Sequence, residues 1–405
     1  MSESTSPVLQ HTKTILLLSE YGVLNGGEFS LLAVLRLIQR SSGSDWRFVA
    51  AVPEGSGLES ELASLQIENV GLSLCDAYGV RLSQDDIRSL LADVIAKVGP
   101  DLVHCNSLAM SRLMGPVAKR LAIPAVGYLR DIYRLSKKAM SDMSQIDRLV
   151  AVSDATKRFH VGQGLDESQV TVIHNGVDSQ AFFPLRNDPE PDSSPNARMR
   201  AERLRAELGL TTERVLLFVG QIGMRKGVDL VLKVFYELSE HYPDLQLVLI
   251  GQRNSAKQEA IDFEAQLHLD CVEVADRVHW LSRRSDVADW MRVATALLHP
   301  ARQEPLGRVL LEAAASGLPI VSTDVGGTRE ILGGPLSSQF TGGNDDADAL
   351  LQAISRVLDE ETLRCELGDE LRQIAIDRFS VEQCASQLAA VYRTLALATP
   401  NLSDG

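Results

Sequence analysis

Two glutamates eight residues apart, Glu304 and Glu312, are the strongest candidates for chemistry in this sequence. They lie in LHPARQEPLGRVLLEA (298–313), which has the pattern of a strand, a loop and a helix over 307–315. A carboxylate can accept hydrogen bonds from two vicinal hydroxyls, as on a sugar ring or a ribose. Unpaired N–H groups at the start of such a helix can serve hydroxyls or phosphate oxygens. These are the amides of Leu306, Gly307, Arg308 and Val309. Taken alone, a glutamate on a helix flank is more often a solvated surface charge.

Two glycine-rich loops each follow a predicted strand and precede a predicted helix. The first, YGVLNGGE (21–28), contains Gly26 and Gly27, whose backbone N–H groups could approach a phosphate at a helix start. The second, VGQIGMRKGVD (219–229), places Arg225 beside Lys226, which suits a diphosphate group. These residues alone leave two alternatives open. The first loop could be a flexible turn, and the second could carry a solvated charge pair.

Other polar motifs indicate structure rather than catalysis. Asp346 and Asp348 formally match a metal-binding DxD, but they precede a predicted helix, where aspartate caps N–H groups. His104 closes a predicted strand and is expected in the core. The 5 cysteines are scattered, without CxxC or a Cys/His cluster, so neither disulfides nor zinc is expected.

The elements that must position these residues alternate between strand and helix along the whole chain. Strands are predicted at 13–19, 46–52, 101–105, 125–129, 148–153, 170–174, 215–220, 245–251, 277–281, 295–299 and 319–323. Helices are predicted at 29–39, 87–98, 228–239, 285–292, 307–315 and 381–396. Several strands are apolar throughout, which is typical of parallel strands covered on both faces. The pattern predicts an α/β protein with two doubly wound, Rossmann-like domains.

A chain of 405 residues fits two domains. We expect a disordered lead-in (1–12), an N-terminal domain (13–185), a linker or insertion rich in proline and acidic residues (186–200) and a C-terminal domain (201–378). A last helix (379–396) is expected to return to the first domain, followed by a flexible tail (397–405). Two such sheets facing across a cleft would present their carboxyl strand ends to a pair of substrates.

The amino-acid composition limits the kinds of partner that the protein is expected to bind. With 40 basic and 54 acidic residues the formal charge is −14, which argues against nucleic acid. A run of about 18 apolar residues and a signal peptide are both missing, so a cytoplasmic location is expected, with peripheral contact at the inner face of a membrane left open. The segment 112–158 is locally basic, with ten basic against four acidic side chains. It is either an ordinary solvated surface or an acceptor-side surface for anionic lipid, phosphorylated sugar or nucleic acid.

Residues 304–327, Glu-x7-Glu followed by AxxSGLPIVSTDVGG, resemble the donor-site signature of the retaining GT-B glycosyltransferases of family 4. The resemblance extends to GG at 26–27, VSDATK at 152–157, IHNGVD at 173–178 and Gly-x5-Lys-Gly at 220–227. It implies transfer of a hexose-type sugar, with retained configuration, from a nucleotide diphosphate sugar to an acceptor hydroxyl. It implies UDP or GDP as the nucleotide, a sugar, lipid or other glycoconjugate as acceptor, and no metal ion or further cofactor.

The resemblance also implies roles for individual residues. Glu312 would hold the ribose hydroxyls, and Glu304 would face the donor sugar with help from the amides of 306–309. Lys226 would neutralise the leaving diphosphate, with Gly27 and its neighbour Gly26 contributing at the first loop. The segment HWLS (279–282) matches the part of the family that lies beside the base.

Two positions depart from the family pattern. Gln221 stands where the family usually carries arginine, and Arg225 stands where relatives are commonly acidic, so we expect Arg225 to restore the missing charge. Arg130 replaces a histidine that contacts the donor sugar. A guanidinium cannot act as a base, so Arg130 could instead bind an acceptor carboxylate or phosphate or the donor diphosphate, or it could simply pair with Asp131.

Two other classes of function compete with this interpretation. An NAD-dependent oxidoreductase could use two Rossmann-like halves, but GxGxxG and the acidic ribose residue are both missing. A catalytically silent nucleotide-sugar-binding protein is suggested by Gln221 and Arg130, while Lys226, Glu304 and Glu312 argue against it.

Overall fold

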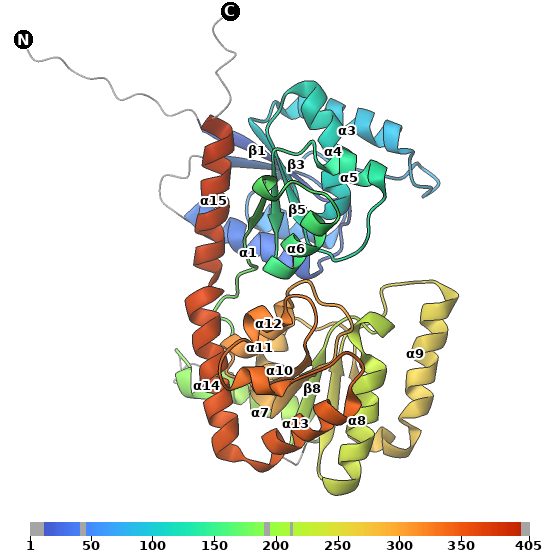
Figure 1. The fold of residues 1–405 in the computed structure, drawn as a ribbon, viewed down its shortest axis with the longest axis vertical. Helices are drawn as coiled ribbons and strands as arrows, with labels where there is room; N and C mark the ends of the chain where they lie inside the picture. Colours follow the sequence, from blue (N-terminus) through green and yellow to red (C-terminus); the bar gives the residue numbers. More distant parts are fainter. Residues whose placement is uncertain (1–11, 41–45, 190–194, 211–213, 398–405) are drawn as a thin grey trace, which may run out of the picture. The chain divides into compact units, whose positions relative to one another are not determined.

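Parallel strands form a sheet in each of two compact units (Figure 1). The structure, a computed structural model, describes residues 12–40, 46–189, 195–210 and 214–397. Unit 1 comprises Met1–His174 together with Val381–Gly405, and unit 2 comprises Asn175–Ser380.

The sheet of unit 1 has the strand order β3-β2-β1-β4-β5-β6-β7. Its strands can be apolar along their whole length because helices cover both faces, and Ile15 to Leu18 in β1 are all buried. The strands are β1 Lys13–Leu18, β2 Trp46–Ala51, β3 Glu68–Asn69, β4 Leu102–Cys105, β5 Ala125–Leu129, β6 Arg148–Ala151 and β7 Val170–Val172.

The helices of unit 1 begin for a local reason. Five of them follow a serine whose hydroxyl accepts a hydrogen bond from the backbone N–H three residues later, and these serines are Ser56, Ser83, Ser107, Ser136 and Ser153. The helices are α1 Gly26–Arg40, α2 Gly57–Ser64, α3 Gln84–Val98, α4 Leu108–Leu121, α5 Lys137–Met143, α6 Asp154–Gly162 and α15 Val381–Leu397. Helix α15 packs against α1.

The sheet of unit 2 has the order β10-β9-β8-β11-β12-β13. Its strands are β8 Val215–Val219, β9 Gln246–Ile250, β10 Val278–Leu281, β11 Ala296–His299, β12 Ile320–Thr323 and β13 Thr341–Gly342. Its helices are α7 Ala197–Glu207, α8 Val228–His241, α9 Gln258–Asp270, α10 Val287–Val293, α11 Arg308–Ala315, α12 Thr328–Ile331, α13 Ala347–Asp359 and α14 Glu361–Arg378.

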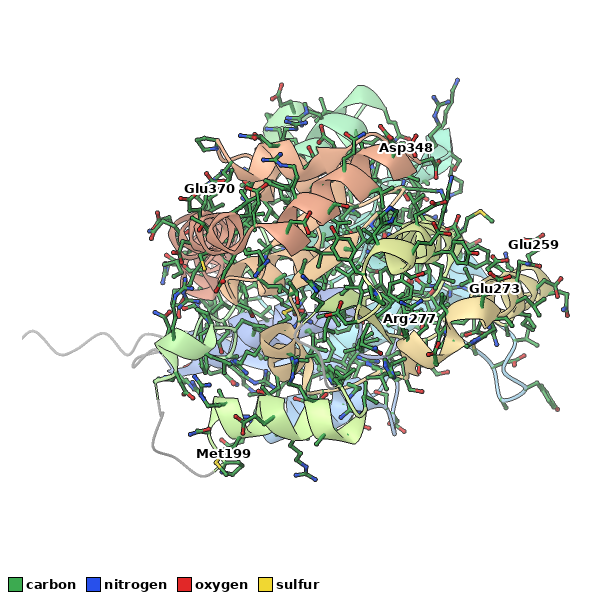
Figure 2. The ribbon with its side chains drawn as sticks, turned by 90° about the horizontal axis from the view of Figure 1, so that it is seen from below. Met199, Glu259, Glu273, Arg277, Asp348 and Glu370 are labelled. Carbon is green, nitrogen blue, oxygen red and sulfur yellow. The ribbon has the colours of Figure 1, made fainter. Side chains whose placement is uncertain are left out.

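Helices are arranged around the sheet of unit 2. Figure 2 shows Met199 of α7, Glu259 of α9, Asp348 of α13 and Glu370 of α14 around the outside of the unit. Glu370 also accepts hydrogen bonds from the backbone N–H groups of 336 and 337, at 3.0 and 2.6 Å, and so fixes the loop beside α14.

Both sheets reverse their strand order at one point, between β1 and β4 in unit 1 and between β8 and β11 in unit 2. In open α/β sheets, ligands bind outside the carboxyl ends of the strands at such a switch point. The loops after β1, β4, β8 and β11 are therefore where the site residues should lie.

The predicted α/β fold with two doubly wound sheets is confirmed. The eleven strands predicted from the sequence are all present, and only the two-residue strands β3 and β13 were missed. Helix α7 begins at Ala197, inside the predicted linker 186–200. The predicted lead-in and tail, and part of that linker, lie outside the described residues. Among the described helices, none is both long and apolar enough to span a bilayer.

Candidate functional site

Three side chains meet at the switch point of unit 2. Lys226 Nζ lies 2.5 Å from Glu304 Oε2, and His299 Nε2 lies 2.8 Å from the same oxygen. His299 ends β11, Glu304 follows in the next loop, and Lys226 comes from the loop after β8. The side chains of Lys226, Glu304 and His299 are only 14%, 6% and 0% exposed. The structure thus brings Lys226 and Glu304 into contact at the carboxyl edge of the sheet.

A glycine brings the two loops together. Gly227 has φ +69°, and a Cβ there would stand 2.0 Å from the carbonyl oxygen of Pro300, so this position excludes other residues. Arg302 braces the same region, because its guanidinium donates to Met224 O at 2.7 Å and to Asp229 at 2.7 and 2.9 Å. Gly227 and Arg302 therefore fix the backbone of the loop that carries Lys226.

The charge of Glu304 depends on these neighbours. Burial alone would raise the pKa of Glu304, but Lys226 and His299 outweigh it and hold the pKa well below its usual range. Burial lowers the pKa of His299 in spite of its hydrogen bond to Glu304. An ionised carboxylate can only accept, so neutral His299 must donate its Nε2–H to Glu304. Glu304 is thus an ionised carboxylate that contacts one cation, Lys226, and one neutral hydrogen-bond donor, His299.

Helix α11 supplies the second carboxylate. Glu312 is buried and pairs with Arg308 one turn earlier at 2.6 Å, and burial raises the pKa of Glu312 although Arg308 opposes the change. The helix follows Gly307, which has φ +95°. Within the part of the chain that the structure describes, no side-chain hydrogen bond caps this helix. Leu306 is buried there and Val309 half-buried.

The two unusual residues of the loop after β8 differ in exposure. Arg225 is exposed, and its Nη1 lies 3.3 Å from the carbonyl oxygen of Gln303. Gln221 is half-buried directly after Gly220. Arg225 therefore reaches the loop that carries Glu304.

Unit 1 builds its own cluster at the β1–β4 switch point. Arg130, which follows β5, donates to the backbone and side-chain oxygens of Asn106 at 2.9 and 2.8 Å, and its guanidinium lies 4.1 Å from the ring centre of Tyr128. A Cβ on Gly27 would stand 3.0 Å from the Arg130 side chain, so this residue lies directly against the start of α1. Gly26, the first residue of α1, is exposed. The structure thus joins Arg130 to the glycine pair, an association that spacing alone could not show.

Two family models match the chain, one after the other. "Glycosyltransferase Family 4" matches residues 33–181, and "Glycosyl transferases group 1" matches residues 200–375. The chain belongs to glycosyltransferase family 4. It is a glycosyltransferase. Neither the oxidoreductase nor the silent binding protein is favoured.

Relatives and solved structures agree with this family. The chain is 26% identical to "Spore coat protein SA" of Bacillus subtilis (strain 168), over 77% of this chain and 83% of the relative. It is 27% identical to "D-inositol 3-phosphate glycosyltransferase" of Xylanimonas cellulosilytica, over 72% and 71%. The structure of Anabaena HepE in complex with UDP-glucose superimposes with a TM-score of 0.79 at 19% identity, over 94% of this chain and 100% of that chain. The expected GT-B fold is confirmed.

The sequence did not single out every residue that the structure brings into the two clusters. His299 and Asn106 were missed, although each lies at or just after the carboxyl end of a strand at a switch point. That position is the signal that could have found them. Asp346 accepts a hydrogen bond from the N–H of Ala349 at 3.0 Å, so its capping role is confirmed. His104 is fully buried against Tyr392, 2.6 Å away, as expected for a core histidine.

The basic segment 112–158 is distributed over several elements of the enzyme. Lys138 pairs with Asp142 and Lys157 with Glu167, while Arg148 donates to a backbone carbonyl of residue 168. The exposed members are Lys119, Arg120, Arg134, Lys137, Lys138 and Arg158. A continuous cationic patch on this segment therefore contains fewer side chains than the ten basic residues of 112–158.

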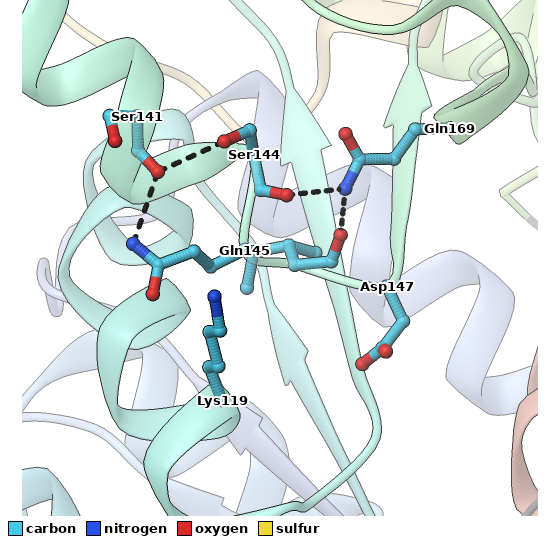
Figure 3. A pocket seen from close by; sticks show the side chains of 7 residues that line it. Lys119, Ser141, Ser144, Gln145, Asp147 and Gln169 are labelled. Atoms are coloured by element: carbon cyan, nitrogen blue, oxygen red, sulfur yellow. Dashed lines mark hydrogen bonds between the residues drawn. The ribbon is translucent and has the colours of Figure 1, made fainter.

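An open hollow of about 490 Å³ lies at the opposite edge of the unit 1 sheet (Figure 3). It lies at the amino ends of β6 and β7, and Lys119 and Asp147 are among its lining residues. Gln145 and Gln169 already donate to backbone carbonyls there, at 3.1 and 3.0 Å. The amino edge is not the ligand edge of such a sheet, so the hollow is not part of the candidate site.

Proposed function

We propose that unit 2 binds a UDP- or GDP-hexose through Lys226, Glu304 and Glu312, and that unit 1 binds the acceptor. The observation that carries the donor site is the buried contact of Lys226 and His299 with one oxygen of Glu304. This arrangement keeps an ionised carboxylate and a cation together in a nearly dry place, where electrostatic interactions with a ligand are strong.

Lys226 is the group proposed to neutralise the leaving diphosphate. A diphosphate carries more charge than one carboxylate, so it competes with Glu304 for the ammonium group and frees Glu304 for the hydroxyls of the donor sugar. Arg225 is proposed as the second cation, in place of the arginine missing at Gln221. The backbone N–H groups of 306–309, at the start of α11, would assist at the sugar and phosphate oxygens.

Glu312 is proposed to accept the two ribose hydroxyls. It is a buried carboxylate with one cationic partner, Arg308, and a carboxylate has room for further hydrogen bonds on its two oxygens. We expect base recognition beside 279–282, where His279 is half-buried and lies 2.9 Å from Gln246.

The transfer step is proposed to need no metal ion. The bond from the sugar to the diphosphate oxygen breaks, and the acceptor oxygen bonds to the same carbon on the same face. The acceptor proton passes to the departing phosphate oxygen, so no side chain serves as the base. Positive charge near that oxygen stabilises it as the bond breaks, which is the role proposed for Lys226 and Arg225.

The acceptor is proposed to carry an anionic group in reach of Arg130. An arginine against a helix N-terminus is a favourable place for a phosphate or carboxylate. Two relatives support a charged or lipid-linked acceptor, since one is named for D-inositol 3-phosphate and another for lipopolysaccharide core biosynthesis. The exposed cations of 112–158 would then assist at a membrane surface.

A panel of nucleotide sugars tests the donor. We expect UDP-glucose, as in the complex of HepE, or GDP-mannose to raise the melting temperature by several degrees, because a ligand that binds only the folded state stabilises it. Glu312→Gln should reduce the shift for the free nucleotide as well, while Glu304→Gln should reduce it for the nucleotide sugar alone. A chain that responds to no UDP-, GDP- or ADP-sugar contradicts the proposal.

A further inference from the structure

The first turn of α11 carries an arginine whose side chain the proposed function does not use. Arg308 is the first residue of α11, and its Nη2 lies 2.6 Å from Oε1 of Glu312, one turn further along the helix. The side chain of Arg308 is 28% exposed and that of Glu312 only 10%. The pair therefore differs from an ordinary surface ion pair, whose partners stay in contact with water and gain little from pairing.

The order of the two charges along α11 is unfavourable for the stability of the helix. The N-terminus of a helix carries a partial positive charge, so acidic residues are favoured in the first turn. Helices α8 and α13 follow this rule with Asp229 and Asp348. Helix α11 has a cation there instead, and a basic residue that precedes its acidic partner is the less stabilising order. The stability of α11 therefore does not account for Arg308.

The charge of Glu312 depends on this arginine. Burial raises the pKa of Glu312, whereas Arg308 opposes the change by its charge and by its hydrogen bond. An ionised carboxylate accepts hydrogen bonds on both oxygens, but a protonated carboxyl gives up part of this capacity to its own O–H. Two ribose hydroxyls that both donate therefore need the ionised form of Glu312.

The elements packed against α11 do not supply a substitute for Arg308. These elements are α12, α14 and β12, and β12 has no titratable side chain. Arg372 of α14 donates to a backbone oxygen at the end of α11. The charged side chains of α12 and of the loop before α11 are Arg302, Glu304, Arg329 and Glu330. Within the described part of the chain, Arg308 is the charged group that lowers the pKa of Glu312.

We propose that Arg308 is the positioning residue of the ribose site, which holds one oxygen of Glu312 and keeps this carboxylate ready to accept the hydroxyls of the nucleotide. The inference rests on the proposed function, in which Glu312 takes the ribose hydroxyls. Arg308 acts through Glu312 and not on the phosphates. Its contact with one carboxylate oxygen also limits rotation of the group, so that Glu312 is oriented before the nucleotide arrives.

Calorimetric titration of the full chain with UDP, and with GDP in parallel, between about pH 5.5 and 8.5 tests this role. Binding by the wild type should weaken as pH falls through the pKa of Glu312 in the folded protein. In Arg308→Met the same weakening should begin about one to three pH units higher, as for the loss of a close opposite charge. The affinity then falls about tenfold for each pH unit below that point.

Two further variants make the comparison specific. Arg308→Lys keeps a cation at this position and should restore the wild-type pH profile. Arg214→Met is the matched control, because Arg214 also pairs with a carboxylate of unit 2, Asp244, at 3.1 Å, but it precedes β8 at the amino edge of the sheet. This variant should bind UDP as the wild type does at every pH. The nucleotide's own phosphate titrates identically in all of these experiments.

A double variant separates an indirect role from a direct one. Because Arg308 acts through Glu312, adding Arg308→Met to Glu312→Gln should change the affinity for UDP by less than about threefold. The same loss of affinity with and without Glu312 would assign Arg308 to the phosphates and overturn the inference. Arg308→Gln, which also removes the charge, takes the place of Arg308→Met if that variant does not fold.

The remaining outcomes distinguish this inference from the donor proposal. Nucleotide binding with the same pH profile in the wild type and Arg308→Met would contradict the role of Arg308 alone. A pH profile that Arg308→Lys does not restore would contradict it as well. If neither UDP nor GDP binds the wild type, the proposed donor site itself fails, and the role of Arg308 fails with it.

Discussion

Replacing Lys226 by alanine should destabilise unit 2 in a way that depends on pH. The substitution leaves Glu304 buried with only His299 as a partner, since the side chain of Glu304 is 6% exposed. Burial then raises the pKa of the carboxyl, and the group escapes its desolvation penalty by binding a proton. In such a variant, stability is present at low pH and is lost as pH rises through the raised pKa of the folded state.

The size of the effect follows from the ordinary pKa of glutamate. Protonating a carboxyl with the usual value of 4.5 costs about 1.36 kcal/mol per pH unit above that value, or ~3.4 kcal/mol at pH 7 and ~0.7 kcal/mol at pH 5. The free-energy cost of burying the unpaired carboxylate cannot exceed the cost of protonating it, because the carboxyl binds a proton once that state is lower in free energy. The destabilisation by Lys226→Ala should therefore shrink by about 2 to 3 kcal/mol between pH 7 and pH 5.

Urea unfolding followed by tryptophan fluorescence measures the effect, since Trp290 is fully buried in unit 2. The double variant Lys226→Ala with Glu304→Gln is the matched control, because it has no carboxyl to protonate and should show no such dependence on pH. The electrostatic account of the pair is refuted if Lys226→Ala lowers the free energy of unfolding by the same amount at both pH values. It is also refuted if that amount is the same with and without Glu304.

Four further predictions concern the same unit. Glu312→Gln should weaken UDP binding about ten- to hundredfold by calorimetry, without lowering the free energy of unfolding at pH 7, since burial raises the pKa of this carboxyl and penalises its ionised form there. Arg225→Ala should lower turnover by about tenfold or more if this residue is the second cation, whereas a bystander would cost less than a few-fold; Lys226→Ala is the comparison. Gly227→Ala should lower the melting temperature and abolish the nucleotide-sugar shift, because a Cβ there meets a backbone oxygen at 2.0 Å. Asp346→Ala should cost about 1 kcal/mol of stability through its cap and leave turnover unchanged with or without EDTA, while an effect of EDTA would indicate a metal ion.

The fold could be predicted from the sequence because its signals are local and repeated. Strands such as 15–18 are apolar at every position, which is typical of a parallel sheet covered on both faces. Strands β3 and β13 were missed because each is two residues long and has no pattern to read. These two short strands form because a neighbouring strand pairs with them, and not because of a pattern in their own residues.

The site could be predicted only in part. The contact between Lys226 and Glu304 follows from the loops they occupy, whose strands are neighbours at a switch point. The contacts of Arg130 with Asn106 and Gly27 join segments that follow different strands, so spacing along the chain carries no trace of them. His299 looks like an ordinary strand residue until its partner is seen.

Release of nucleotide from UDP-glucose and GDP-mannose, with and without acceptor, tests the central claim most directly. The account predicts slow release by the wild type and a rate at least about a hundredfold lower for Glu304→Gln in a chain that is still folded. Release that is unchanged in Glu304→Gln, or absent from the wild type with every nucleotide sugar, would contradict the assignment of this buried carboxylate to the donor sugar.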